Sequence, residues 1–231
     1  MTVVDNERVK LRGRSHVSIS TGGRELPIEI TVTGQLPAGS GSLFVENALL
    51  QQSNHPEFID QYNEPSAVIG KTDFDRIDHT AVYTFGVDKR DLVFHRHKGH
   101  RVITGITGGK GCILKFSLCS PSDARKQPEL FWKNLYVVQI PGDRQFVLRF
   151  SGTVYHQFCP ASPDENGFFA ISVHTNEATG LSGELLQTVL NNNGNIALLT
   201  EPAPPQVLSM GVDEALLKSA IYINLDSEKS Q

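Results

Sequence analysis

The sequence predicts an all-β protein with a short helical segment at its C-terminal end. Between residues 15 and 174, apolar and polar residues alternate in short segments separated by Gly, Pro, Asp and Ser, a pattern typical of strands with one buried face. Beyond residue 176, apolar residues recur at helical spacing instead. The chain has 231 residues, 39% of them hydrophobic, which is enough for one well-buried domain.

Eight or more strands are predicted within residues 1–176. The alternation is clearest at residues 28–32 and 114–118. Further strands are predicted at 79–85, 92–97, 135–140, 145–150, 153–159 and 168–174. No helical pattern separates them, and two long loops are expected at 51–78 and 120–128. So many strands favour a sandwich or a barrel, because a doubled or closed sheet hides their apolar faces and edges.

Residues 177–231 are predicted to form a helical appendage that packs on the barrel or on a second subunit. Leucine and valine recur at helical spacing from Leu181 to Leu190, and Asn and Gly follow, which favours a helix end. A second helix is predicted to begin at Asp213, whose carboxylate suits an N-cap. Its apolar face would consist of Leu216, Leu217, Ala220 and Ile221. The proline-rich stretch 201–206 predicts a stiff connector between these helices.

Charge and composition argue against several classes of function. The 21 basic and 25 acidic residues give a net charge of −4, without the basic surplus that nucleic-acid binding requires. No segment approaches the ~20 apolar residues of a membrane-spanning helix, and the first 14 residues are polar, so a soluble cytoplasmic protein is expected. Cys112, Cys119 and Cys159 lack CxxC spacing, which predicts neither disulfides nor a zinc–thiolate site.

Three of the eight histidines fall within six residues, at positions 95, 97 and 100. On a strand, side chains two residues apart emerge on the same face, so His95 and His97 would stand side by side. His156 has the parity of its apolar neighbours and would point into the interior, where an imidazole needs a partner. Together they predict a three-histidine site for Fe, Mn, Ni, Cu or Zn. His100 is a loop residue, a supporting residue or a fourth ligand.

These segments resemble the two metal motifs of the cupin superfamily. The stretch that begins with His95 and His97 is similar to His-x-His-x(3,4)-Glu-x(6)-Gly, and residues 150–156 are similar to Pro-x-Gly-x(2)-His. The resemblance covers residues 79–174, under half of the chain. It implies a double-stranded β-helix, or jelly-roll barrel, with a metal ion inside, and association into a homodimer.

The chain departs from both motifs. Arg101 stands where the family has its acidic ligand, so the resemblance implies a site of three histidines here. Phe150 replaces the proline of the second motif, and three residues rather than two separate Gly152 from His156. These departures leave the expected barrel unchanged but do not point to one particular activity.

Further residues are predicted to act beside the metal. Tyr83 shares the parity of Ala81 and Phe85 and is expected to point inward. Arg101 could bind a carboxylate through two hydrogen bonds. Both are candidate catalytic residues. Arg149, His79 and His174 are candidates for substrate binding. The simpler alternatives are an exposed arginine paired with an acidic residue and a histidine that is hydrogen-bonded within the structure.

The leading functional hypothesis is an Fe(II) dioxygenase-type oxidoreductase acting on a small anionic organic substrate. Three neutral imidazoles leave the 2+ charge of an ion uncompensated, which favours anionic chelating substrates, and a resemblance to three-histidine cupins such as thiol dioxygenases implies chemistry with O₂. One divalent ion is expected, with Fe(II) favoured over Zn, Mn, Ni or Cu. The alternatives are a non-catalytic small-molecule-binding cupin, for sensing or storage, and a metal-dependent isomerase or lyase.

Overall fold

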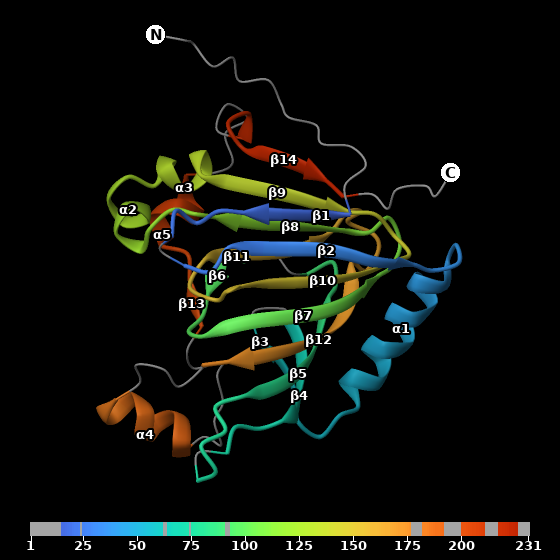
Figure 1. Ribbon diagram of the computed structural model, residues 1–231, viewed down its shortest axis with the longest axis horizontal. Coiled ribbons are helices and arrows are strands. Elements are labelled where there is room, and N and C mark those ends of the chain that lie inside the picture. The colour runs from blue at the N-terminus through green and yellow to red at the C-terminus, as the bar shows by residue number, and fades with distance from the viewer. Residues whose placement is uncertain are drawn as a thin grey trace.

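The computed structural model describes residues 15–23, 25–61, 64–73, 75–90, 93–176, 182–191, 200–210 and 217–225. The chain forms two β-sheets packed face to face (Figure 1). The all-β architecture predicted from the alternating pattern is therefore confirmed. Among the described residues, no helix is long and apolar enough to span a membrane.

One sheet has eight strands, all antiparallel to their neighbours. In spatial order they are β1 (His16–Ile19), β2 (Ile28–Gln35), β10 (Arg144–Ser151), β7 (His100–Thr107), β12 (Phe168–Thr175), β5 (Ala81–Val87), β4 (Glu64–Gly70) and β3 (Phe58–Gln61).

The other sheet has six strands, and β14 pairs with β9 in parallel. Their order is β13 (Glu201–Pro202), β6 (His95–Arg96), β11 (Tyr155–Pro160), β8 (Cys112–Ser117), β9 (Leu135–Ile140) and β14 (Ile221–Asn224).

The core lies between the inner faces of the two sheets. Phe116 of the six-stranded sheet contacts Phe150 of the eight-stranded sheet, with ring centroids 5.5 Å apart. Phe158 and Phe168 meet across the same interface at 6.1 Å. All four rings are buried, and burial of such side chains contributes about 1.5–3 kcal/mol each. The period-2 alternation in the sequence therefore marks the core accurately.

Helix α1 (Ser40–Ser53) contradicts the prediction that no helix interrupts the strands. It packs on the outer face of the eight-stranded sheet (Figure 1), where Gln52 Nε2 donates a hydrogen bond to Thr84 Oγ1 at 3.0 Å. Leu43 and Leu50 on this helix are 64% and 60% exposed while Val45 is fully buried. Apolar residues therefore lie on several sides of α1, so the sequence lacks the clean apolar stripe that predicts a helix.

The two predicted long loops are also largely ordered into elements. Residues 51–78 contain the end of α1 and the β3–β4 hairpin. Residues 120–128 contain α2 (Pro121–Lys126), which precedes α3 (Glu129–Lys133). The Ser120 side chain accepts a hydrogen bond from the Asp123 backbone N–H at 3.1 Å, so it caps α2. Short helices of this length have too few residues to show a helical period.

The C-terminal residues follow the prediction only in part. Helix α4 (Gly183–Asn191) is confirmed. The predicted connector at 201–206 is wrong, because these residues form β13 and the start of α5 (Pro205–Ser209). Asp213 and Leu216, at the start of the second predicted helix, lie outside the described residues, and Ile221 begins strand β14. Strands β13 and β14 form the two edges of the six-stranded sheet.

Candidate metal centre

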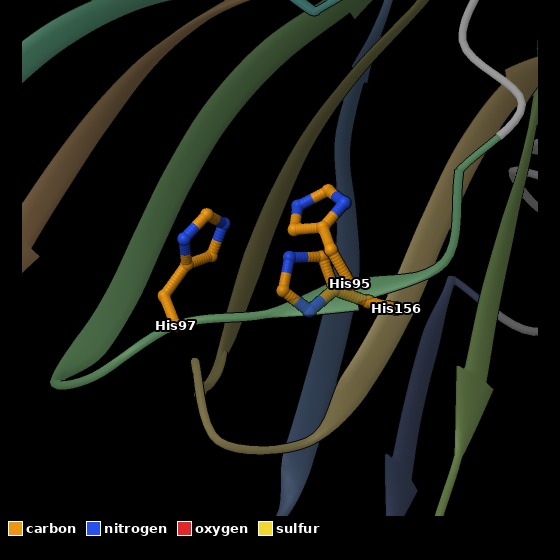
Figure 2. Close-up of side chains that lie close together, drawn as sticks. All are labelled: His95, His97 and His156. Atoms are coloured by element: carbon orange, nitrogen blue, oxygen red, sulfur yellow. The ribbon is translucent and has the colours of Figure 1, made fainter. Parts of the chain in front are cut away.

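Three histidines converge inside the barrel, as the sequence predicts. His95 on β6 and His156 on β11 are direct partners in the six-stranded sheet, and His97 follows β6 immediately. The ring centroids of His95 lie 4.6 Å from His97 and 4.5 Å from His156, and those of His97 and His156 are 5.3 Å apart. One ring nitrogen of each residue lies within 4.8 Å of the others. Figure 2 shows the three rings side by side.

Each histidine uses its Nδ1 atom in a hydrogen bond. His95 Nδ1 lies 3.1 Å from the Val93 carbonyl oxygen, and His156 Nδ1 lies 2.8 Å from that of Val154. A carbonyl only accepts, so the proton of these two rings is on Nδ1 and the lone pair is on Nε2. His97 Nδ1 lies 3.1 Å from Thr200 Oγ1. Partners of this kind fix the tautomer and orientation of metal-binding histidines.

Burial keeps the three rings neutral. His95 and His156 are buried, and burial lowers the pKa of His95 to about 4, helped by the charge of Arg101 and opposed by the Val93 hydrogen bond. Burial also brings the pKa of His97 and of His156 well below the usual value. Deprotonated Nε2 atoms at neutral pH are the form that binds a metal ion.

Gly152 explains why the turn that carries His97 lies so close to the next hairpin. The His97 N–H donates to the Gly152 carbonyl at 2.7 Å, and the Gly152 N–H donates to the Gly99 carbonyl at 2.9 Å. A Cβ atom at position 152 would lie 3.1 Å from the Lys98 carbonyl oxygen and 3.4 Å from His97 Cβ. A side chain here would push the turn and His97 away from the cluster.

Glu64 lies beside His95, and the sequence reasoning missed it. Its Oε2 lies 3.3 Å from His95 Nε2. Glu64 begins β4 and shares the parity of Ser66, which pairs with Phe85 of the inner face. The strand could have been predicted from alternation, because residues 64, 66 and 68 share one face of it. Pro65 and Gly70 interrupt that stretch, which is why it reads as a loop.

Arg101, His174 and Tyr83 form a row across the inner face of the eight-stranded sheet, and Tyr83 points inward as its parity predicts. Arg101 on β7 pairs with His174 on β12, and the His174 ring stacks on Tyr83 of β5 with centroids 4.5 Å apart and an interplanar angle of 26°. All three residues are buried. Arg101 Nη1 donates to the Lys98 carbonyl at 3.1 Å. The sequence predicts these three residues near the metal, and Arg101 and His174 lie near enough to the cluster to lower the pKa of His97 and of His156.

The structure does not bring Arg149, His79 and His100 to the cluster. Arg149 projects from the outer side of β10, is 47% exposed and forms an ion pair with Glu29 at 2.9 Å, which is the simpler alternative for this residue. His79 is half-buried in the segment before β5. His100 precedes the inward-pointing Arg101 on β7 and so faces the opposite side of the sheet. Within the described residues, only His95, His97 and His156 form the group.

The C-terminal segment supports the strand that carries His95. Strand β13 pairs with β6, with Glu201 opposite Arg96 and Pro202 opposite His95. The Arg96 side chain forms an ion pair with Glu201, and the Ala203 N–H donates to the Phe94 carbonyl at 2.7 Å. Together with the Thr200 contact to His97, these bonds make residues 200–203 part of the site. The sequence reasoning missed this role.

The chain matches no protein-family model, and no curated protein matches it in sequence. Its structure is similar to a cupin-like protein from Thermotoga maritima, with 14% identity over 70% of this chain and 92% of the other and a TM-score of 0.34. It is also similar to the non-heme α-ketoglutarate-dependent epimerase SnoN from nogalamycin biosynthesis (11% identity, 68% and 85% coverage, TM-score 0.39). A dTDP sugar isomerase from Desulfovibrio desulfuricans gives 14% identity, 87% and 88% coverage and a TM-score of 0.33.

Proposed function

We propose that this cupin-like barrel binds one divalent metal ion through His95, His97 and His156 and acts on a small anionic organic substrate as an Fe(II) dioxygenase-type oxidoreductase. The observation that carries the proposal is the arrangement of the three rings. They are neutral, they lie within reach of one ion, and each has its Nδ1 atom engaged elsewhere. The Nε2 atoms are therefore available as ligands.

The donor set fits a first-row divalent metal. Three imidazole nitrogens on two neighbouring strands can occupy one face of an ion and leave other positions open for substrate. Burial favours this use, because three closely packed polar rings in a protein interior are costly without a partner. Bound iron would supply Lewis acidity and the one-electron chemistry that reactions with O₂ require.

The positive charge of a buried arginine near the histidines supports an anionic substrate. Neutral histidines would leave an ion largely uncompensated, and the buried Arg101 adds a positive charge near enough to lower the pKa of all three histidines. A planar guanidinium binds a carboxylate through two parallel hydrogen bonds. We therefore assign Arg101 the role of holding the carboxylate of the substrate.

Tyr83 is the candidate for moving a proton. It points inward and stacks on His174, and its phenol group can hold or donate a proton at the hydroxyl oxygen. Apolar side chains pack around Tyr83, namely Ala81, Val189 and Val68, and they keep water away from it. Excluding water strengthens electrostatic interactions with a bound substrate.

The first experiment measures the metal content of protein purified without added metal. We expect about one equivalent of a transition metal, and we expect His156→Ala to lose it, because His156 supplies one of three ligands. His16→Ala is the matched control, since His16 is exposed and bonded to Thr31. Equal metal content in the parent and in His156→Ala would show that the three histidines do not form the metal site.

The second experiment measures O₂ uptake by the Fe(II)-loaded protein across a panel of small carboxylic acids. Uptake that depends on substrate and iron, and that is lost in Arg101→Gln, supports the proposal. Turnover without O₂ uptake would instead indicate an isomerase or lyase. Retention of a small molecule without any turnover would indicate a binding protein for sensing or storage.

A further inference from the structure

The outer face of the eight-stranded sheet carries no charged side chain on β5, β7 and β12. The residues at the outward positions of these three strands are Val, Ile, Phe, Thr, Gly and one His. Val173 lies directly between Val82 and Val102 in the register, and Ile171 lies between two threonines. A sheet face in contact with water normally carries polar residues at these positions. This face therefore lacks the charges expected of a free surface.

Exposed apolar side chains continue from the sheet onto helix α1, which crosses one end of this face (Figure 1). Ile171 is 49% exposed, and Phe44 on α1 is 43% exposed. The Phe44 ring contacts Phe169, the preceding outward residue on β12, with centroids 6.2 Å apart. The helix and the sheet thus present one apolar surface. We call this surface the outer apolar face and define it by Phe44, Val82, Val102, Thr104, Ile171 and Val173.

The sheet around this face is large enough for a stable protein contact. Strands β2, β10, β7, β12 and β5 are neighbours and are seven or eight residues long. At about 4.8 Å between strands and about 3.4 Å per residue, they span about 24 Å by 25 Å, or roughly 600 Å². A standard interface buries about 800 Å² on each partner, which is of the same order.

We propose that the outer apolar face is the contact between two copies of this chain, related by a two-fold axis. The same patch meets itself in such a contact, and a patch without charge brings no like charges together. Each copy has a net charge of −4, so contact through charged surfaces would be opposed by repulsion. At the border of the face, Arg149 and Glu29 neutralise each other at 2.9 Å.

The contact would lie directly behind the row of polar residues on the inner face of the same strands. Val102 follows Arg101 on β7, and Val173 precedes His174 on β12, so each pair points to opposite sides of the sheet. A partner packed on the valines would hold these two strands from outside. The inference goes beyond the proposed function, because the contact forms whether or not a metal ion is bound.

Sedimentation velocity of the full-length parent protein tests the proposal over about 1–100 µM. We expect a reversible equilibrium between monomer and dimer within this range. Ile171→Asp would place one carboxylate from each copy inside an apolar contact. We expect it to weaken dimer formation about 30-fold or more, which corresponds to the loss of an interface hot spot.

Ile221→Asp is the matched control, because Ile221 is 44% exposed on β14 of the other sheet. It should form dimers as the parent does. Thr104→Asp is a second variant within the outer apolar face, at an exposed polar position where a carboxylate is compatible with folding. It should weaken dimer formation in the same direction as Ile171→Asp. Circular dichroism of each variant checks that it is folded.

Thermal unfolding at several protein concentrations gives a second measurement, because association stabilises the folded chain by mass action. The melting temperature of the parent and of Ile221→Asp should rise with concentration, and that of Ile171→Asp should not.

A parent protein that stays monomeric at the highest concentration would show that the inference is wrong. Dimers that persist unchanged in both Ile171→Asp and Thr104→Asp would also contradict it, because the contact would then lie elsewhere. An equal loss of dimer in Ile221→Asp and Ile171→Asp would do the same. If Ile171→Asp does not fold, Thr104→Asp decides alone. None of these outcomes bears on the metal site, so the proposed function stands or falls separately.

Discussion

At the scale of single residues, two phenylalanines hold His156 in place. The Phe150 ring lies 4.8 Å from the His156 ring at 75°, and the Phe158 ring lies 5.3 Å away at 34°. Phe150 is fully buried and Phe158 nearly so. Close-packed neighbours of this kind restrict the orientation of the imidazole. The hydrophobic core therefore also fixes the direction of one metal ligand.

Phe150→Ala should lower the free energy of unfolding by about 3–5 kcal/mol, because it leaves a cavity between the two sheets. Denaturant unfolding followed by circular dichroism measures this loss. Leu43→Ala is the control, since Leu43 is 64% exposed and such changes cost under about 0.5 kcal/mol. Equal stability losses for the two variants would contradict the packing described for Phe150.

The sequence predicts the three histidines but not their neighbours. His95, His97 and His156 can be recognised because strand parity shows which side chains point inward. Glu64 cannot, since the pairing of β4 with the sheet depends on contacts that its short, interrupted alternation does not specify. Thr200 is separated from His97 by 103 positions, and no local pattern predicts a single hydrogen bond over that distance.

At the scale of elements, the two-residue strand β6 depends on its neighbours. It lies between β11 and β13 in the six-stranded sheet, and a strand this short has few bonds of its own. Strand β13 holds it through the Arg96–Glu201 ion pair and the bond from Ala203 to Phe94. Thr200 then orients the His97 ring directly.

Thr200→Val should weaken metal binding about 10–100-fold, because it removes the hydroxyl partner of His97 Nδ1 while keeping the side-chain shape. Competition with a chelator of known affinity measures the change. Thr200→Ser should retain most of the affinity. The control Thr188→Val, whose hydroxyl donates to the Glu184 carbonyl in the exposed helix α4, should retain all of it. Identical affinities for Thr200→Val and Thr200→Ser would show that the hydroxyl does not position His97.

Helix α1 shows why this element could not be predicted. Its N-terminal N–H groups are satisfied from far away in the chain, because the Asp143 carboxylate accepts from Gly39 at 2.9 Å and from Gly41 at 2.8 Å. Capping normally comes from the residue before a helix, so the local sequence carries no start signal. The helix is stabilised by tertiary contacts, which override weak local preferences.

At the scale of the whole molecule, the buried apolar residues of the described part of the chain form two large hydrophobic clusters and a small one around Tyr83. The larger one lies between the sheets and includes Ile223 and Leu225 from the C-terminal end. The second lies around α2, α3 and α5 and includes Trp132, the single tryptophan. The barrel itself could be predicted from strand patterns, but the pairing of the C-terminal strands could not, because two to four residues show no usable period.

Leu225→Ala should destabilise the whole barrel by about 2–5 kcal/mol, because Leu225 is fully buried between the sheets. We expect Trp132 fluorescence and far-ultraviolet circular dichroism to report the same shifted unfolding transition, since both clusters belong to one cooperative unit. Exposed Leu208→Ala serves as the control, at 50% exposure. An unshifted Trp132 transition in Leu225→Ala would show that the two clusters unfold independently.

The placement of these polar residues on two facing sheets has a stereochemical consequence. The histidines belong to the six-stranded sheet, whereas Arg101, His174 and Tyr83 stand in a row on the eight-stranded sheet. A small acid held by its carboxylate on one wall would turn a single face toward the opposite wall. Its mirror image could not satisfy both walls at once, so we expect this protein to select one enantiomer of a chiral acid.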